Sequence, residues 1–520
     1  MPLGRTHGVA LVGLTGHIVE VEADIGQTLP AFVLLGLPDA SLHEAKDRIR
    51  SAAQNSGVPL SRRKITVNLI PATLPKRGSS FDLAIVVAAL RAAGDIRDPG
   101  SAVFIAELGL DGRLRPVRGV LPAVMAAAGA GYSDVVVAAA NADEAKLVPG
   151  VNVHSYRTLA EVALALGADP LHLVLPEDSE AAAEVSLSSA DDDGTGPAPR
   201  DVPDMADVAG QGDARLALEV AAAGAHHLLM TGPPGAGKTM LAERLPGLLP
   251  DLDDSKAMEV TAIHSLGGLA AERASLIRRP PFESPHHSST AVAIIGGGTG
   301  IPRPGAASRA HRGVLFLDEA PEYHRGVLDA LRQPLESGQL VIQRSAGTAS
   351  YPARFQLVLA ANPCPCGQAS AKGINCTCTP FKRRQYFTRI SGPLLDRVDI
   401  QLSVPRVSFS DFATGEMAES TAVVAERVKR ARLLQHRRLA PFGCETNVEV
   451  PGRVLRNHFA LDRRITRDMD MALERETLTA RGYDRVLRVA WTLADLGGRE
   501  RPNEDDVGTA LAFRQQVSAV

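Results

Sequence analysis

The sequence has few aromatic residues, little net charge and no long apolar run. Phe, Trp and Tyr make up 4% of its 520 residues, and Trp491 is the single tryptophan. The formal net charge of −3 excludes a global attraction to nucleic acid or to an anionic membrane, so any polyanion site must be a local patch. No stretch approaches the roughly 18 apolar residues of a membrane span, and no signal peptide is recognisable. We therefore expect a cytoplasmic protein without a membrane contact.

Cysteine is also scarce, and four of the five cysteines lie in one short segment. In a reducing compartment such clustering favours a metal over disulfides, and four thiolates can complete a tetrahedral zinc site. The two pairs are spaced more tightly than the usual gap of about two to four residues. Reduced thiols or another arrangement are therefore the alternative to Zn²⁺. The candidate ligands are Cys364, Cys366, Cys376 and Cys378.

The length predicts about three domains, and the composition divides the chain into four segments. Residues 1–172 alternate short β-branched runs with Ala-rich helical stretches, which predicts an α/β or α+β domain. Residues 173–204 have little to bury and predict a flexible acidic linker. Residues 205–405 alternate helices with short apolar strands that are typical of a buried parallel sheet. Residues 406–520 predict a small helical bundle, with helices at 421–439, 463–477, 480–496 and 504–516.

One octapeptide has the chemistry of a phosphate-binding loop. It follows an apolar strand and opens a predicted helix, which is the context that such a loop requires. Its glycines let backbone amides curl around phosphates, and the helix N-terminus adds positive potential. Lys238 supplies a charge to the β- and γ-phosphates of ATP, and Thr239 supplies a hydroxyl ligand to Mg²⁺. The loop reads Gly232-Pro233-Pro234-Gly235-Ala236-Gly237-Lys238-Thr239.

Two further predicted strands end in polar residues. The run 314–317 is followed by Asp318, which can hold Mg²⁺, and by Glu319, which can orient and deprotonate the attacking water. The run 356–361 ends at Asn362. Because ligands gather at the carboxyl ends of parallel strands, Asn362 can contact the γ-phosphate or the water. The alternative is an asparagine that merely begins a turn before proline.

These motifs, together with the segments 280–287 and 390–397, resemble the magnesium-chelatase-like AAA+ ATPases, specifically the ComM/YifB group. The resemblance covers nearly the whole chain. It implies an α/β multidomain protein with an AAA+ P-loop core containing a parallel sheet, and a C-terminal helical lid of the magnesium-chelatase type. It also implies an ATP hydrolase that uses ATP and Mg²⁺ as cofactors and works as a self-assembled hexameric ring.

The same resemblance implies roles for individual residues. Asn362 matches the sensor 1 position, and Arg397 matches the arginine finger that reaches into a neighbour's nucleotide site. Arg481, at the start of a lid helix, matches sensor 2. Gly210 and Gln211 lie where the family contacts the base or its surroundings. For Arg397 the alternative is an ion pair with one of two nearby carboxylates, Asp396 or Asp399.

The segments 76–82, 107–113 and 117–121 resemble the proteolytic domain of the Lon family, a ribosomal S5 domain 2-like fold. In that family a lysine activates a serine nucleophile. Ser80 lies near the position of the nucleophile, but Leu121 stands where the lysine is expected. Arg118 cannot replace the lysine, because a guanidinium does not deprotonate at neutral pH. We therefore expect a non-catalytic relative of the protease domain.

The substrate of the motor is less defined than its ATPase site. The ComM resemblance implies a DNA translocase or helicase that promotes branch migration on single-stranded or branched DNA in recombination or transformation. The segment 382–389 interleaves cations with aromatics, which suits a DNA strand, although a solvated basic loop or a subunit contact fits as well. A chelatase-type metal-insertion motor and a protein-remodelling ATPase are the alternatives, and Leu121 argues against a protease. The expected DNA contacts are Lys382, Arg383, Arg384 and Tyr386, with loops of 265–312 that carry His286, His287, Gly296, Gly297 and Gly298.

Overall fold

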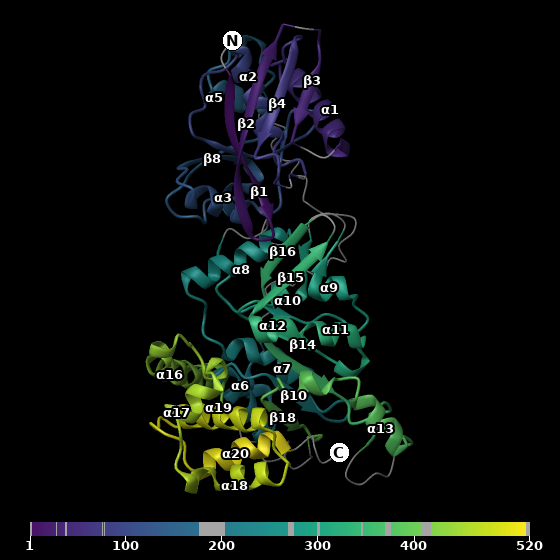
Figure 1. The fold of residues 1–520 in the computed structure, drawn as a ribbon, viewed down its shortest axis with the longest axis vertical. Helices are drawn as coiled ribbons and strands as arrows, with labels where there is room; N and C mark the ends of the chain where they lie inside the picture. Colours follow the sequence, from purple (N-terminus) through teal and green to yellow (C-terminus); the bar gives the residue numbers. More distant parts are fainter. Residues whose placement is uncertain are drawn as a thin grey trace.

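The computed structural model describes the chain in three stacked parts (Figure 1). Most of the predicted linker, residues 176–202, lies outside the described residues. None of the helices in the described part combines the length and the apolar character that crossing a bilayer requires. The described residues are 3–27, 29–36, 39–74, 76, 78–175, 203–268, 275–298, 302–344, 347–369, 376–407 and 418–515.

The amino-terminal part is built on a seven-stranded mixed sheet. Its strand order is β3-β4-β2-β1-β5-β8-β9. The long strands β1 and β2 form an antiparallel hairpin, whereas β5, β8 and β9 run parallel to one another. The strands are β1 (Gly4–Val12), β2 (Thr15–Gly26), β3 (Phe32–Leu35), β4 (Lys64–Ile70), β5 (Val103–Ile105), β8 (Asp134–Ala138) and β9 (Asn152–Tyr156).

Helices cover this sheet, and their sequences match their burial. Helix α2 (Asp82–Ala93) packs against β1 and β2 and also against α1 (Asp39–Asn55). A helix enclosed in this way needs apolar residues all round rather than on one stripe, and ten of its residues are buried. The remaining elements are α3 (Val120–Gly129), α4 (Ala142–Ala145), α5 (Leu159–Ala165) and the short hairpin of β6 (Glu107–Leu108) and β7 (Leu114–Arg115).

The central part contains a five-stranded parallel sheet in the order β11-β14-β17-β10-β18. Successive residues of its inner strands alternate between two separate cores. Met230, Phe316 and Val358 face one core, whereas Leu229 and Leu357 face the other. Because both faces are covered, the strands read as unbroken apolar runs. The strands are β10 (Leu228–Thr231), β11 (Phe282–Glu283), β14 (Val314–Leu317), β17 (Gln356–Ala361) and β18 (Ile400–Ser403).

One face of the sheet is covered by α6 (Gly212–Gly224) and α7 (Lys238–Leu248), and the other mainly by short helices. Two of the predicted strands, 314–317 and 356–361, are confirmed at their predicted limits. The apolar strand that the sequence predicts before the phosphate loop is β10. The short helices are α9 (Ala291–Ile295), α10 (Ala306–Arg309), α11 (Arg325–Ala330) and α12 (Arg332–Ser337).

The carboxyl-terminal helices pack against α6 and α7 and are coloured yellow-green to yellow in Figure 1. The predicted helices 421–439 and 480–496 are confirmed at both ends. Trp491 lies in their core, with its ring 5.3 Å from the ring of Phe459 and 4.7 Å from the guanidinium carbon of Arg438. The helices are α16 (Thr421–Leu439), α17 (Gly452–Asn457), α18 (Arg463–Glu474), α19 (Ala480–Leu496) and α20 (Glu504–Gln515).

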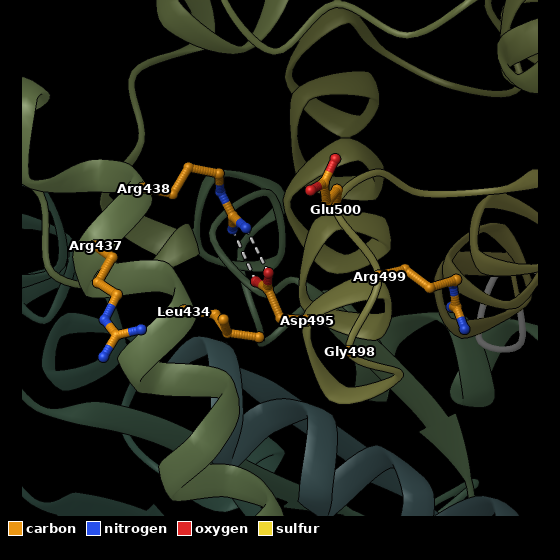
Figure 2. Close-up of a pocket in the computed structure, with 7 residues that line it drawn as sticks. All are labelled: Leu434, Arg437, Arg438, Asp495, Gly498, Arg499 and Glu500. Atoms are coloured by element: carbon orange, nitrogen blue, oxygen red, sulfur yellow. Dashed lines mark hydrogen bonds and ion pairs between the residues drawn. The ribbon is translucent and has the colours of Figure 1, made fainter.

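Arg438 also forms a buried ion pair with Asp495 beside a hollow between α16 and the end of α19 (Figure 2). Its Nη2 lies 2.8 Å from Asp495 Oδ2. The hollow has a volume of about 370 Å³. The pair lies at its inner wall, and its role is therefore to join α16 to α19. The hollow is lined by Leu434, Arg437, Arg438, Asp495, Gly498, Arg499 and Glu500.

The amino-terminal part contacts the central part through its β1–β2 turn and α3. These meet α8 (Asp254–Leu266) and the hairpin of β15 (Gln339–Arg344) and β16 (Gly347–Pro352). Gly13 adopts a left-handed φ of 66°, and a Cβ there would lie 2.8 Å from the Ser350 carbonyl oxygen. Glycine is therefore required for this close approach.

A buried charge cluster attaches the carboxyl-terminal helices to the sheet. Asp399, just before β18, is fully buried and pairs with Arg485 of α19. The His227 backbone N–H donates to Asp399 Oδ2 over 3.1 Å, and His226 Nδ1 lies 3.6 Å from the same oxygen. Burial alone would raise the pKa of Asp399, but Arg485 and His226 outweigh burial and hold this pKa well below its usual range. These contacts explain why β10 begins only after the two histidines.

Replacing Arg485 with Ala should leave a buried carboxylate without its charge partner. The expected loss is about 3–5 kcal/mol of unfolding free energy for the carboxyl-terminal helices. Trp491 is the only tryptophan and lies on α19 with Arg485, so its fluorescence reports this transition. Arg481→Ala removes an exposed arginine from the same helix and should change stability by less than about 0.5 kcal/mol. Equal losses in the two variants would contradict the assigned role of the buried cluster.

Candidate active site

The predicted phosphate loop joins β10 to α7 and leaves the sheet at its carboxyl edge. Gly235 and Gly237 adopt left-handed φ angles of 76° and 86°, which glycine tolerates without strain. Lys238 opens α7, and its Nζ donates to the carbonyl oxygens of Gly232 (2.7 Å) and Pro233 (3.1 Å). Burial lowers the pKa of Lys238, and the charges of Asp318 and Glu319 oppose that shift. The lysine is thus folded back over the loop that the sequence predicts to cradle phosphates.

The two predicted Mg²⁺ ligands lie together. Thr239 Oγ1 donates to Asp318 Oδ2 over 2.7 Å, although 79 residues separate them in the chain. Asp318 ends β14, and its Oδ1 accepts the backbone N–H of Glu319 over 2.8 Å. A hydroxyl and a carboxylate at the carboxyl edge of a parallel sheet fit Mg²⁺ that arrives with a nucleotide.

Asn362 also reaches this point. It follows β17, and its Oδ1 accepts a hydrogen bond of 3.2 Å from Lys238 Nζ. The predicted sensor position therefore lies beside the phosphate-loop lysine. The prediction that Tyr386 stacks on DNA bases was wrong: its side chain is 4% exposed, and its hydroxyl contacts the Asn362 backbone. Burial raises the pKa of Tyr386 to about 12.

Gln211 contacts the phosphate loop from the amino side of α6. Its Nε2 donates to the Ala236 carbonyl oxygen over 2.7 Å, and its backbone adopts a left-handed φ of 49°. Gly210 precedes it with a φ of 61°. These two residues thus lie beside the loop, as the resemblance implies.

A contact that the sequence did not predict involves Glu319. His287 Nδ1 lies 3.1 Å from Glu319 Oε2, and the ring of His286 lies 4.1 Å from that of His287. We predicted both histidines as DNA contacts. One feature of the chain could have indicated this contact. The two histidines lie shortly after β11, and β11 lies next to β14 in the sheet.

Arg397 lies away from this site. Strand β18 runs parallel to β10, with Ile400 opposite Leu228 and Ser403 opposite Thr231. Arg397 precedes β18 and therefore lies at the amino edge of the sheet, whereas the phosphate loop follows β10 at the carboxyl edge. The strands alone separate these edges by about 13 Å. Arg397 of one chain is thus at the wrong edge for its own phosphate loop.

The partners of Arg397 differ from the two carboxylates that the sequence suggested. Its Nη2 pairs with Glu336, and its Nη1 donates to the Pro393 carbonyl oxygen. Burial lowers the pKa of Arg397, and the charges of Arg332, Arg481 and Arg485 lower it further. Arg481 is exposed on the first turn of α19. The two predicted arginines thus belong to one cationic cluster, which depends on side chains that are distant in the sequence.

The four clustered cysteines converge after β17. The Sγ atom of Cys364 lies 3.2 Å from that of Cys366 and 3.6 Å from that of Cys376. The potential ligand atoms of all four, including Cys378, lie within 4.8 Å of one another. Four sulfurs around a zinc ion with bonds of about 2.3 Å would be about 3.8 Å apart. The thiols therefore have the spacing of a tetrahedral thiolate site.

The described residues of the protease-like segments do not bring a lysine to a serine. Leu121 is fully buried in α3, and the side chain of Ser79, not of Ser80, donates to Glu107. Lys76 is buried, and its Nζ is turned to the carbonyl oxygens of Pro71 and Leu74. Burial lowers the pKa of Lys76. Within the described residues, this lysine thus bonds to backbone carbonyl oxygens and not to a serine.

Comparison with known proteins supports the class that this site indicates. The family model "Magnesium chelatase, subunit ChlI" matches residues 204–412, and "Magnesium chelatase, subunit ChlI C-terminal" matches residues 418–514. The model "Subunit ChlI of Mg-chelatase" matches residues 21–141. The fold and the site define a magnesium-chelatase-like AAA+ ATPase.

Individual relatives identify the family within this class to which the chain belongs. Competence protein ComM of Haemophilus influenzae is 39% identical over 99% of this chain and 98% of its own length. YifB of Escherichia coli is 38% identical over 99% of this chain and 97% of its own length. Lon protease of Mycolicibacterium smegmatis is 30% identical over 32% of this chain and 23% of its own length. The chain belongs to the ComM/YifB family of magnesium-chelatase-like proteins.

Proposed function

We propose that this protein is an ATP-driven hexameric ring motor of the AAA+ class that translocates on DNA. The observation that carries its chemistry is the convergence of Lys238, Thr239, Asp318 and Asn362 at one edge of the sheet. In this proposal Mg·ATP binds at that edge, and Glu319 acts as the general base for the attacking water.

The positions of Arg397 and Arg481 support assembly. Both lie at the edge of the sheet opposite the phosphate loop, in a cluster of arginines. A cation that reaches the γ-phosphate of a neighbouring protomer stabilises the transition state and couples the sites around a ring. We propose that both arginines act on the neighbour's nucleotide, with Glu336 holding Arg397 until the subunits meet.

The DNA proposal rests on α13 (Pro380–Phe387), which lies at the lower right of Figure 1, away from the carboxyl-terminal helices. Phe381 is 73% exposed, and Lys382 and Arg384 are exposed beside it. An exposed aromatic followed by exposed cations suits a single strand, because the ring stacks on bases and the cations bind phosphates. The name of the Haemophilus influenzae relative, a competence protein, agrees with a substrate of this kind.

A metal-insertion motor or a protein-remodelling ATPase would use the same nucleotide site. Only the DNA motor requires DNA to stimulate hydrolysis. In all three cases the amino-terminal part is non-catalytic, because Leu121 replaces the lysine that a Lon-type serine needs.

The first prediction tests the action of the arginine between subunits. Lys238→Ala protomers lose nucleotide binding but keep Arg397, and Arg397→Ala protomers bind ATP but lack the finger. Each variant alone should be nearly inactive. Random mixing at an equal ratio should make about one interface in four active. Half of the nucleotide sites keep Lys238, and half of the neighbouring protomers keep Arg397. Failure to complement, with ring assembly confirmed by light scattering, would show that Arg397 acts within its own chain or only as a structural ion pair.

The second prediction tests α13. Lys382→Ala with Arg384→Ala should abolish the stimulation of ATP hydrolysis by single-stranded or branched DNA and leave the basal rate intact. The matched control, Arg463→Ala with Arg467→Ala, removes two exposed arginines from α18 and should retain the stimulation. Wild-type affinity should fall steeply with salt, because phosphate contacts release counterions. If DNA neither binds nor stimulates the wild-type ring at low salt, the DNA proposal is wrong.

We also propose that the cysteine cluster holds one structural Zn²⁺. The site would join the end of β17 to α13, since Cys364 lies two residues after Asn362 and Cys378 two residues before Pro380. The loop also contacts the phosphate loop: a Cβ at Gly367 would lie 2.6 Å from Pro234 Cγ. Hydrogen bonds from the Gln368 backbone and the Cys364 thiol lower the pKa of Cys366 to about 6, whereas burial raises the pKa of Cys364 to about 11.

Metal analysis of protein purified without chelators should find about one zinc per chain. Cys366→Ser with Cys376→Ser should lose the metal and increase hydrogen exchange in α13 more than in α7. Cys444→Ala removes the remaining cysteine, which is buried among the carboxyl-terminal helices, and should retain the zinc. Absence of metal from the wild-type protein would refute the site.

A further inference from the structure

Helix α13 is attached to the central sheet where two neighbouring strands end. Phe387, its last residue, packs against the core on one face of the sheet. Arg389 follows the helix, and its Nη1 donates to the Pro321 carbonyl oxygen over 3.2 Å and pairs with Glu322 over 2.9 Å. Pro321 and Glu322 lie in the short turn after β14. One attachment of α13 is therefore made just beyond the end of β14.

The second attachment is made at the end of β17, the strand that pairs with β14. Tyr386 is 4% exposed, and its hydroxyl oxygen accepts a hydrogen bond from the backbone N–H of Asn362. The ring of Tyr386 meets the ring of Phe387 edge to face, with the two centroids 5.7 Å apart. This packing holds the ring in place. The hydroxyl is therefore fixed at the residue where the chain leaves β17.

The position of the Asn362 side chain depends on how its backbone is held. Strand β17 ends one residue earlier, at Ala361, whose carbonyl oxygen accepts the N–H of Gly232 in the phosphate loop over 3.1 Å. Beyond that point the hydrogen bonds of the sheet no longer fix the chain, and a buried N–H needs another acceptor. The hydroxyl of Tyr386 is that acceptor. It holds the peptide from which the Asn362 amide reaches Lys238.

The two ends of α13 differ in exposure. Its first turn is exposed and carries Phe381, Lys382 and Arg384, whereas its attachments to the sheet, Tyr386 and Arg389, lie at and after its last turn. Eight residues of helix span about 12 Å, and their backbone hydrogen bonds make them move as one piece. A ligand that shifts the first turn therefore shifts the hydroxyl that holds Asn362.

We propose that Tyr386 is a positioning residue for ATP hydrolysis, because its hydroxyl fixes the backbone of Asn362 and so holds the amide side chain beside Lys238. A DNA strand on the first turn of α13 then acts on hydrolysis through this hydroxyl. The inference rests on the proposed function, since it takes Asn362 as a contact of the γ-phosphate or the attacking water and α13 as a contact of DNA.

The first test is steady-state ATP hydrolysis by the assembled full-length protein without DNA. Tyr386→Phe keeps the ring and its packing and removes only the hydroxyl. Its kcat should fall about two- to tenfold, which is the effect of one neutral hydrogen bond that acts on the transition state. Its KM for ATP should change little, because Lys238 and the phosphate loop remain. A wild-type kcat in Tyr386→Phe would overturn the inference.

A double-mutant cycle distinguishes positioning from a general structural role. If the hydroxyl acts through the amide of Asn362, Tyr386→Phe should lower kcat in the wild-type background and have no further effect in Asn362→Ala. Single-turnover measurements with excess enzyme make the slow variants comparable. A merely structural role would lower kcat by the same factor in both backgrounds, and that result would overturn the inference.

The chain offers a matched control in its carboxyl-terminal helices. The hydroxyl of Tyr483 on α19 donates to Asp470 Oδ1 of α18 over 2.8 Å. Tyr483→Phe removes the same atom from another hydrogen-bonded tyrosine. It should leave kcat, KM and the stimulation by DNA unchanged. A loss of kcat in Tyr386→Phe that Tyr483→Phe does not share therefore identifies the contact with Asn362 as its cause.

The role of the hydroxyl in DNA stimulation is tested with single-stranded DNA. Tyr386→Phe should bind the strand with wild-type affinity, because Lys382 and Arg384 remain, but the fold stimulation of hydrolysis should shrink toward none. The variant thus differs from Lys382→Ala with Arg384→Ala, which should lose the binding itself. Wild-type fold stimulation in Tyr386→Phe would show that DNA does not act through this hydroxyl.

Failure of this inference and failure of the proposed function give different results. A wild-type kcat in Tyr386→Phe, beside an impaired Asn362→Ala, would overturn the inference alone. Wild-type turnover in Asn362→Ala would instead refute the assignment of Asn362 to the nucleotide site. Absence of DNA stimulation in the wild type would refute the DNA substrate, while the comparison without DNA would still decide the role of Tyr386.

Discussion

The parallel direction of the five central strands is the constraint on which the rest of the site depends. Because β10, β14 and β17 run the same way, the residues that follow them meet at one edge. Lys238, Asp318 and Asn362 come from three distant segments and need no long side chain to meet. The same direction sends Arg397, which precedes β18, to the other edge. In the proposed ring, a second copy of the chain would therefore bring Arg397 to the nucleotide site.

Two pairs of charged groups in this protein differ in what they can do. Asp399 is fully buried against Arg485, and breaking such a pair costs about 3–5 kcal/mol, so it attaches the carboxyl-terminal helices permanently. The His287–Glu319 pair is partly exposed, and pairs at the surface contribute about 0–1 kcal/mol. The strong pair fixes Arg481 at the amino edge of the sheet. The weak pair can therefore break at little cost in free energy.

Much of the nucleotide site could be predicted because its determinants are local. Gly235 and Gly237 are needed for left-handed backbone angles within the loop itself, and a buried apolar strand followed by Asp318 and Glu319 is continuous in the sequence. Helices α16 and α19 were also predicted at their observed limits, since periodicity and capping are properties of neighbouring residues. The local pattern also predicted that Tyr386 contacts DNA, and this prediction was wrong. An aromatic among cations looks exposed in a sequence, but this one is buried against the end of β17.

The sequence by itself determined the chemical groups of this protein: the phosphate loop, the acidic pair, Asn362, the four cysteines and the missing lysine at Leu121. It could do so because each depends on residue type and short-range spacing. Only the tertiary structure decided which groups meet. It turned His287 toward Glu319, paired Arg397 with Glu336 and gathered four thiols within 4.8 Å of one another. Those contacts join segments that are distant in the chain, so their partners follow from strand order and helix packing, which no local pattern encodes.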